Sequence, residues 1–346
     1  MSSSSARQYF AGMGALFDAA AETCGRHDRC YEIAGKRVLV RAAGNELVVR
    51  TDPALARPAG GRVNPSASDL VVDMWDTATS GVPIGRAPWH PEDLRPLGLV
   101  RTYCDDRFLS AVDVHTASLS VFDRATSHAR FWVEDARRMA YWQSASPLRL
   151  ILSWWGASRG MQLTHAAAVA GPSGAVLLVG GAGVGKSTTS LTCLHAGMQF
   201  LGDDYCLVSA NASPVVHNVY TTAKLQPDAL ERLPEFRPTV RNADRLHREK
   251  AILDLAGSYD GLLGTSAPLR AIVVPRLTGR VRLEPATPGM VLRAMAPSTV
   301  FGLFGATEKS LSVLARVAED VPGFVLELSD DVDEVADAVA GLENAI

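Results

Sequence analysis

Residues 180–187, with the sequence GGAGVGKS, are the part of the chain best suited to bind phosphate. They match the pattern G-x-x-x-x-G-K-[ST], after an apolar run and before a stretch with helical character. Glycines let consecutive backbone N–H groups point at phosphate oxygens, and the start of a helix adds partial positive charge. We therefore expect Lys186 to bind the outer phosphates of a nucleoside triphosphate and the Ser187 hydroxyl to coordinate Mg²⁺. The expected phosphate-binding residues are Gly180, Gly181, Ala182, Gly183, Val184, Gly185, Lys186, Ser187 and Thr188.

Two aspartates, Asp203 and Asp204, follow a short apolar run and are expected at the end of a strand, near the glycine-rich loop. Phosphoryl transfer to a hydroxyl needs a carboxylate to orient and deprotonate the nucleophile, and a metal ion needs further oxygen ligands. Because neighbouring residues on an extended segment point to opposite sides, only one of the two can face the reacting phosphate. Together with Ser187, both are candidate metal ligands; the alternative is a solvated turn.

His165 lies near the start of an expected strand, residues 164–170, which precedes the expected strand 175–179. A single histidine is more often a packed side chain than a catalytic one. If the two strands pair, however, His165 can approach the phosphates at the strand end. Several basic residues are candidates for contact with phosphate or an acidic peptide, and Arg276 is the foremost because it lies at the end of an apolar stretch. The others, for which a solvated surface is the alternative, are Lys224, Arg245, Arg248, Lys250 and Arg270.

The elements that must position these residues belong to two expected domains. Residues 1–145 predict a β-rich N-terminal domain, in which two β-branched runs flank Gly44-Asn45 as in a hairpin. The domain begins with an expected amphipathic helix, in which Phe10, Met13, Phe17 and Ala20 recur at helical spacing.

From residue 146 onward, apolar strands are mixed with helices, one of which is stopped by Gly197 after the glycine-rich loop. The last helix carries Val332, Val335, Val339 and Leu342 on one face. This mixture predicts an α/β domain over residues 146–346, with a sheet covered by helices.

The composition argues against several classes of partner. A formal net charge of −3, from 34 basic and 37 acidic residues, gives no strong positive field, so neither nucleic acid nor a membrane surface is an expected partner. Five scattered cysteines do not suggest a disulfide framework, and Cys24, His27 and Cys30 lack the second pair typical of a metal site. With neither an apolar run of about 20 residues nor the pattern of a signal peptide, we expect a cytoplasmic protein.

The residues around the loop resemble the catalytic domain of the HPr kinase/phosphorylase family. His-Ala near a strand start, the loop, a helix closed by Gly197 and an Asp-Asp pair follow in the family's order. Lys186 lies 21 residues after His165, and Asp204 lies 18 residues after Lys186, as in that family. The resemblance implies a P-loop kinase domain after the β-rich domain, with Asp204 as general base and His165 as the active-site histidine. It covers about residues 160–210 closely and the C-terminal part more weakly.

The chain lacks the R-G-x-G-I-I signature of the bifunctional enzymes, so reverse phosphorolysis is not expected. It looks more like HPr-kinase-related proteins, some of which phosphorylate a serine of a precursor peptide. This implies an ATP- and Mg²⁺-dependent kinase that acts on a serine hydroxyl of a peptide or small protein, with the N-terminal domain recruiting the substrate. A homo-oligomer is compatible with the sequence. The alternatives are a kinase of a free small molecule and a nucleotide-dependent regulatory module with little transfer activity.

Overall fold

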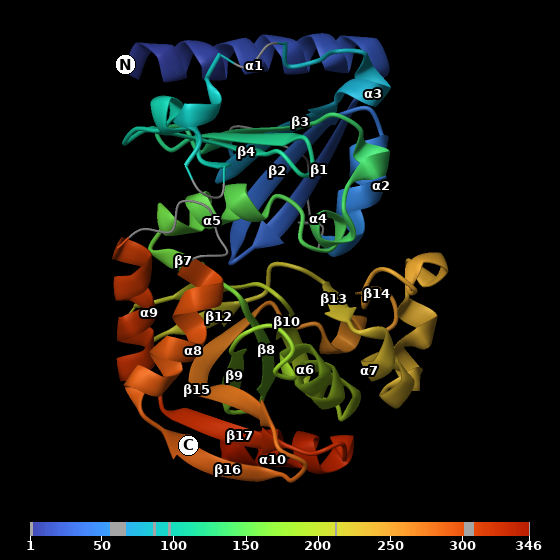
Figure 1. Cartoon of the computed structure of the whole chain (residues 1–346), viewed down its shortest axis with the longest axis vertical. Coiled ribbons are helices and arrows are strands. Elements are labelled where there is room, and N and C mark those ends of the chain that lie inside the picture. The colour runs from blue at the N-terminus through green and yellow to red at the C-terminus, as the bar shows by residue number, and fades with distance from the viewer. Residues whose placement is uncertain are drawn as a thin grey trace. The chain divides into compact units, whose positions relative to one another are not determined.

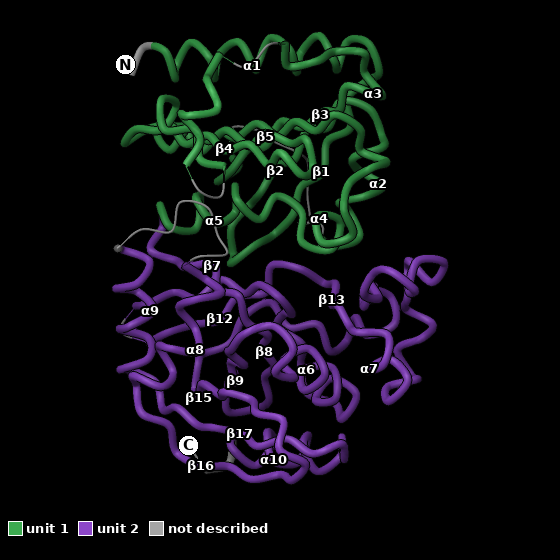
Figure 2. The backbone as a smooth tube through the Cα atoms, in the orientation of Figure 1, with its two compact units in different colours: residues 1–158 green, residues 159–346 purple. Residues whose placement is uncertain are grey.

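The computed structural model describes residues 3–55, 67–85, 88–95, 98–211, 213–300 and 308–345. The chain is mixed α/β and forms two compact units, residues 1–158 and residues 159–346 (Figures 1 and 2).

The units divide after Ser158, whereas we expected the second domain to begin at residue 146. The difference is due to helix α5 (Arg149–Ala157), which packs against strand β5 of unit 1. Its Trp155 is fully buried and donates a hydrogen bond from Nε1 to the Asp69 carbonyl, 3.3 Å away.

Unit 1 is built on a six-stranded sheet with the order β1-β2-β3-β6-β5-β4. Strand β3 runs parallel to both of its neighbours, whereas the other pairs are antiparallel. As its periodicity predicts, helix α1 (Ser3–Cys24) buries Phe10, Met13 and Phe17 against the sheet. The strands are β1 (Arg26–Ile33), β2 (Lys36–Ala43), β3 (Leu70–Asp76), β4 (Phe108–Asp113), β5 (Ser118–Asp123) and β6 (His128–Val133), and the short helices α3 (Thr77–Ser80) and α4 (Tyr141–Ala145) complete the unit.

The hairpin predicted around Gly44-Asn45 is wrong. Residues Glu46–Thr51 form helix α2, whose Leu47 and Val48 are buried. A short run of β-branched residues suits a strand or a buried helical turn equally well, so periodicity alone could not decide. Strand β2 instead forms its hairpin with β1, through a turn at Ala34 and Gly35 in which both φ angles are positive, 52° and 68°.

Unit 2 is built on a nine-stranded sheet. Its main path has the order β10-β8-β9-β15-β12-β11-β7, and β17 also pairs with β15 and with β16. The long strand β15 lies parallel to β9 and to β17, and so links the strand of the glycine-rich loop to the C-terminal part of the chain. The strands are β7 (Met161–Thr164), β8 (Ala166–Gly171), β9 (Gly174–Val179), β10 (Gln199–Gly202), β11 (Cys206–Ser209), β12 (Val215–His217), β15 (Ser266–Leu277), β16 (Arg282–Ala286) and β17 (Gly323–Leu328).

Helices cover both faces of this sheet, as predicted for an α/β domain (Figure 1). Alternate residues of β8 enter different cores: Ala166 and Ala168 pack in the core shared with α8 (Pro288–Val300) and α9 (Glu308–Asp320), and Ala167 packs in the other. The second core receives helices α6 (Lys186–His195) and α10 (Val332–Ala345). The predicted apolar face of α10 is confirmed at Val335, Val339 and Leu342.

A two-stranded sheet, β13 (Thr222–Leu225) and β14 (Ala251–Asp254), stands beside the main sheet with helix α7 (Pro227–Arg232). Its apolar side shares a third core with Leu191 and Leu194 of α6. The same helix that follows the glycine-rich loop therefore anchors this small sheet next to the loop.

The structure also shows the state of the cysteines, the grouping of possible metal ligands and the character of the helices. All five cysteines are free thiols, and Cys193 and Cys206 are fully buried. Among the described residues, no group of three or more His, Cys, Asp or Glu side chains is placed to hold a metal ion. In the same part of the chain, no helix has both the length and the apolar character that crossing a bilayer requires.

Candidate active site

The glycine-rich loop connects the end of β9 at Val179 to the start of α6 at Lys186, which is the strand–loop–helix context that the motif requires. Gly185 shows why glycine is needed there. Its φ is +104°, and a Cβ at this position would lie 2.5 Å from Leu328 Cδ1. A Cβ on Gly181 or Gly183 would instead have nothing within 4 Å, so the loop is open at these two positions.

The N-terminus of α6 is suited to receive an anion. Its first turn contains no acidic residue, and its N-cap, Gly185, offers no side chain to accept a hydrogen bond. The partial positive charge of the helix end is therefore not neutralised within its own first turn. Together with the open loop, this arrangement fits an oligophosphate.

The ammonium of Lys186 lies inside the loop. Its Nζ donates hydrogen bonds of 2.8 Å to the carbonyl oxygens of Gly180 and Gly181. The side chain is almost fully buried, and burial lowers the pKa of Lys186, although the carboxylates of Asp203 and Asp204 oppose the shift. A buried cation that binds only neutral carbonyls is well placed to gain from a phosphate group.

Asp203 and Asp204 point in different directions, as predicted for adjacent residues. Asp203 is buried and accepts hydrogen bonds from Ser187 Oγ at 2.8 Å and from the backbone N–H of Lys224 at 2.9 Å. Asp204 lines the pocket above the loop. Its φ of +67° turns the chain between β10 and β11, a conformation that Asp tolerates better than most residues.

The carboxylate of Asp204 lies between two basic side chains. It forms an ion pair with Lys224 Nζ, and His165 Nε2 is 3.6 Å from its Oδ1. Burial raises the pKa of Asp204, but the charge of Lys224 and the contact with His165 outweigh it, so the pKa is well below its usual range. Burial and the neighbouring charge of Asp204 raise the pKa of Asp203. Asp204 is therefore the anionic member of the pair.

His165 lies in the link between β7 and β8, at the edge of the loop. Because β8 pairs antiparallel with β9, with Ala166 opposite Val179, the preceding residue His165 falls level with the first glycine of the loop. Its backbone N–H donates to Thr299 Oγ1 at 3.1 Å. Its Nδ1 is buried and has no hydrogen-bond partner among the described residues. The strand pairing on which its expected approach to the site depended is thus present.

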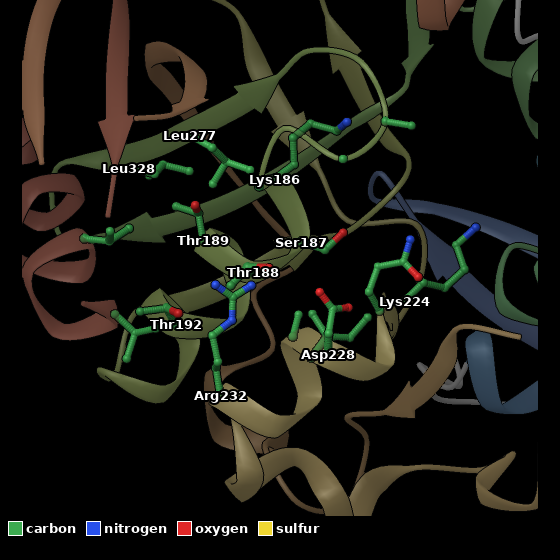
Figure 3. A pocket seen from close by; sticks show the side chains of 18 of the residues that line it. Lys186, Ser187, Thr188, Thr189, Thr192, Lys224, Asp228, Arg232, Leu277 and Leu328 are labelled. Carbon is green, nitrogen blue, oxygen red and sulfur yellow. The ribbon is translucent and has the colours of Figure 1, made fainter. Parts of the chain in front are cut away.

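A pocket of about 210 Å³ joins these groups (Figure 3). One end holds the loop, Asp204 and His165, and the other is lined by apolar side chains of β15, β17 and α10. Between them, Figure 3 shows Arg232 pointing from α7 toward the side of α6 that carries Thr188 and Thr192. The Arg232 guanidinium also forms an ion pair of 2.6 Å with Asp330. A polar end next to an apolar end suits a ligand with an anionic part and an aromatic or aliphatic part.

Arg276 lies outside this pocket, contrary to its prediction as a site residue. It is exposed, while the next residue, Leu277, lines the pocket. Side chains alternate along β15, so Arg276 points to the other side, where its charge acts on Glu327. Two of the other basic candidates are engaged elsewhere: Arg245 pairs with Glu249 at 3.5 Å, and Arg270 donates to the Ser173 carbonyl.

The sequence did not single out three basic residues that line the pocket. Lys224 and Lys250 line the pocket but were only two among six basic candidates, and Arg232 was not considered. They come from segments more than 35 residues after the loop, and no local motif marks them. Their placement depends on the pairing of β13 with β14.

The donors near Ser187 fit a hard divalent cation. The Ser187 hydroxyl and the Asp203 carboxylate are 2.8 Å apart, and oxygen ligands of these kinds are those that Mg²⁺ prefers. Asp204, the third predicted metal ligand, is instead paired with Lys224. The residues present therefore support Ser187 and Asp203 more strongly than Asp204 as metal ligands.

Comparison with known proteins finds no match among protein-family models and none among curated proteins. Among solved structures, one similar chain is the Hpr(Ser) kinase/phosphatase from Coxiella burnetii, with 12% sequence identity and a TM-score of 0.32. The similarity covers 53% of this chain and 97% of that chain. The likeness is distant, and the roles of the residues in the site rest on the geometry described above.

Proposed function

We propose that unit 2 is an ATP- and Mg²⁺-dependent kinase that transfers the γ-phosphoryl group to a serine hydroxyl of a peptide or small protein. One observation carries the proposal: a single pocket joins a phosphate-binding loop to the carboxylate of Asp204. Next to it, Asp203 accepts a hydrogen bond from the hydroxyl of Ser187 at the end of the loop. Phosphoryl transfer needs these parts close together.

In this proposal, most of the catalysis comes from positioning and electrostatics. The backbone N–H groups of the loop and the Lys186 ammonium bind the phosphates and stabilise negative charge. Asp204 orients the substrate hydroxyl and accepts its proton, while the hydroxyl oxygen bonds to the γ-phosphorus and ADP leaves. When bound, Mg²⁺ would neutralise phosphate charge, and Ser187 and Asp203 would hold it.

His165 has a positioning role in this proposal. With Nε2 3.6 Å from Asp204 and its backbone bonded to Thr299, it restrains the carboxylate at the entrance of the loop. The serine acceptor and the recruiting role of unit 1 rest on the resemblance to HPr-kinase-related proteins, not on this geometry.

The decisive experiment incubates the full chain with ATP, Mg²⁺ and candidate serine peptides, and reads phosphate addition by intact mass. Asp204→Asn should lower turnover by about a hundredfold or more, the usual contribution of a general base, while nucleotide affinity changes little. The matched control is Asp320→Asn on α9, an exposed carboxylate outside the pocket, which should leave turnover unchanged. Full activity of Asp204→Asn would refute the proposed role.

A second candidate is a nucleotide-dependent binding module with little transfer activity. The ion pair with Lys224 favours it, because a carboxylate with a lowered pKa is a weaker base. In that case ATP binds, but no acceptor gains phosphate and Asp204→Asn changes no turnover. A kinase of free small molecules would phosphorylate metabolites and leave every peptide unmodified.

A further inference from the structure

The small sheet formed by β13 and β14 borders the pocket through Lys224 on β13 and through Lys250, the residue directly before β14. Leu225 pairs with Ala251, and both are buried in the core shared with α6. Lys224 and Lys250, one residue before each of them, line the pocket. Because side chains alternate along a strand, Lys224 projects from the side opposite to that core.

Lys224 contacts both aspartates, through different atoms. Its backbone N–H donates to Asp203 Oδ2 at 2.9 Å, and its Nζ forms the ion pair with Asp204. The side chains of Lys224 and Asp204 are 12% and 19% exposed, so solvent screens this pair only weakly. One residue of β13 thus helps to set both the separation of the two carboxylates and the charge of Asp204.

Lys250 differs from Lys224 because its ammonium group is not paired with a carboxylate among the described residues. It lines the same pocket, and within the described ranges its side chain takes part in no ion pair or hydrogen bond. Burial lowers the pKa of Lys186, and the positive charge of Lys250 adds to this effect. Two cations that border one pocket and repel each other, neither paired with a carboxylate, are a site for an anion with more than one charge.

We propose that this sheet forms the second wall of the phosphate site, in which Lys250 binds the oligophosphate directly and Lys224 is the positioning residue for Asp204. The inference deepens the proposed function, and it rests on that function only where turnover is measured. It assigns different consequences to the loss of two lysines that line one pocket.

The first test measures the binding of inorganic tripolyphosphate and of ATP by calorimetry, at neutral pH and with Mg²⁺. Lys250→Met should weaken the binding of tripolyphosphate by about tenfold or more, the size of a lost charge-assisted hydrogen bond. Lys250→Arg should recover most of the loss. The matched control is Lys309→Met on α9, an exposed lysine outside the pocket, for which no change is expected. Unchanged affinity in Lys250→Met overturns the assignment of Lys250.

The second test is a double-mutant cycle on the stability of unit 2 at neutral pH, read by hydrogen exchange of peptides from β10 and β13. Lys224→Met should cause a smaller loss of protection in the Asp204→Asn background than in the wild type, because the ion pair is already absent there. Lys224→Arg should retain most of the protection, and Lys250→Met should cause the same loss in both backgrounds.

Where the protein is active, Lys224→Met should lower kcat with little change in the KM for ATP, and Lys224→Arg should restore kcat. Equal losses of protection by Lys224→Met in both backgrounds refute the positioning role, whether or not the protein transfers phosphate. If Lys224→Met fails to fold by circular dichroism, Lys224→Gln replaces it. Because calorimetry and hydrogen exchange need no turnover, failure of this proposal and failure of the kinase assignment give different results.

Discussion

Replacing Gly185 by alanine tests whether the shape of the loop depends on close packing against β17. The backbone there has a φ of +104°, and the new Cβ would lie 2.5 Å from Leu328 Cδ1. A non-glycine residue in a sparsely populated backbone region costs about 1–3 kcal/mol. Overpacking a buried contact costs about as much again, so we expect the free energy of unfolding of unit 2 to fall by roughly 2–5 kcal/mol.

Hydrogen exchange, read by mass spectrometry on peptides from β9 and α6, measures this loss locally. A loss of 2 kcal/mol corresponds to about a 30-fold decrease in protection. All six tryptophans lie in unit 1, so tryptophan fluorescence reports on unit 1 alone and serves as an internal reference for the change measured in unit 2. Gly181→Ala, for which nothing lies within 4 Å of the added atom, should stay within about 0.5 kcal/mol of the wild type.

A double-mutant cycle separates the two costs. Leu328→Val removes the δ-carbons that the new methyl group would meet but leaves the backbone strain at Gly185. We therefore expect Gly185→Ala to cost at least about 1 kcal/mol less in the Leu328→Val background. Equal costs in both backgrounds, or a loss in Gly181→Ala as large as in Gly185→Ala, would show that packing against Leu328 does not constrain the loop.

Three further predictions concern the site. Ser187→Ala removes a hydroxyl assigned to Mg²⁺, so its ATP affinity in saturating Mg²⁺ should approach that of the wild type in EDTA, as measured by calorimetry. Arg276→Ala should leave the ATP Kd within about twofold, because the side chain lies outside the pocket; a tenfold loss would return Arg276 to the site. Burial raises the pKa of Asp204, but the opposing effect of Lys224 is larger, so the pKa in the folded protein is lowered. The carboxylate therefore stabilises the fold above its unfolded pKa, and this stabilisation is lost as the pH falls through the folded pKa. The difference in Tm between the wild type and Asp204→Asn should therefore shrink on acidification.

The adjacent aspartates illustrate how far local reasoning reaches. Alternation along an extended segment predicted that Asp203 and Asp204 diverge, and the structure has one against Ser187 and the other in the pocket. Their electrostatic states could not be predicted in the same way. They depend on Lys224, which is 20 residues farther along the chain than Asp204 and contacts both carboxylates.

The amino-acid sequence by itself determined the loop between β9 and α6, the helix that follows it, and the nearby aspartate pair. These features depend on residues close in the chain: glycines that allow the turn, a helix start, and strand alternation. Gly185 marks the limit, because its need for glycine arises partly from Leu328, more than 140 residues away.

Only the tertiary structure decided which distant charges enter the site. Lys250 lines the pocket because β14 pairs with β13, whereas Arg276 lies outside because Leu277 occupies the inward position on β15. Likewise, α5 belongs to unit 1 because its apolar side chains are buried there. Strand register and the choice of packing partner are long-range properties, and a basic or apolar residue carries no local sign of them.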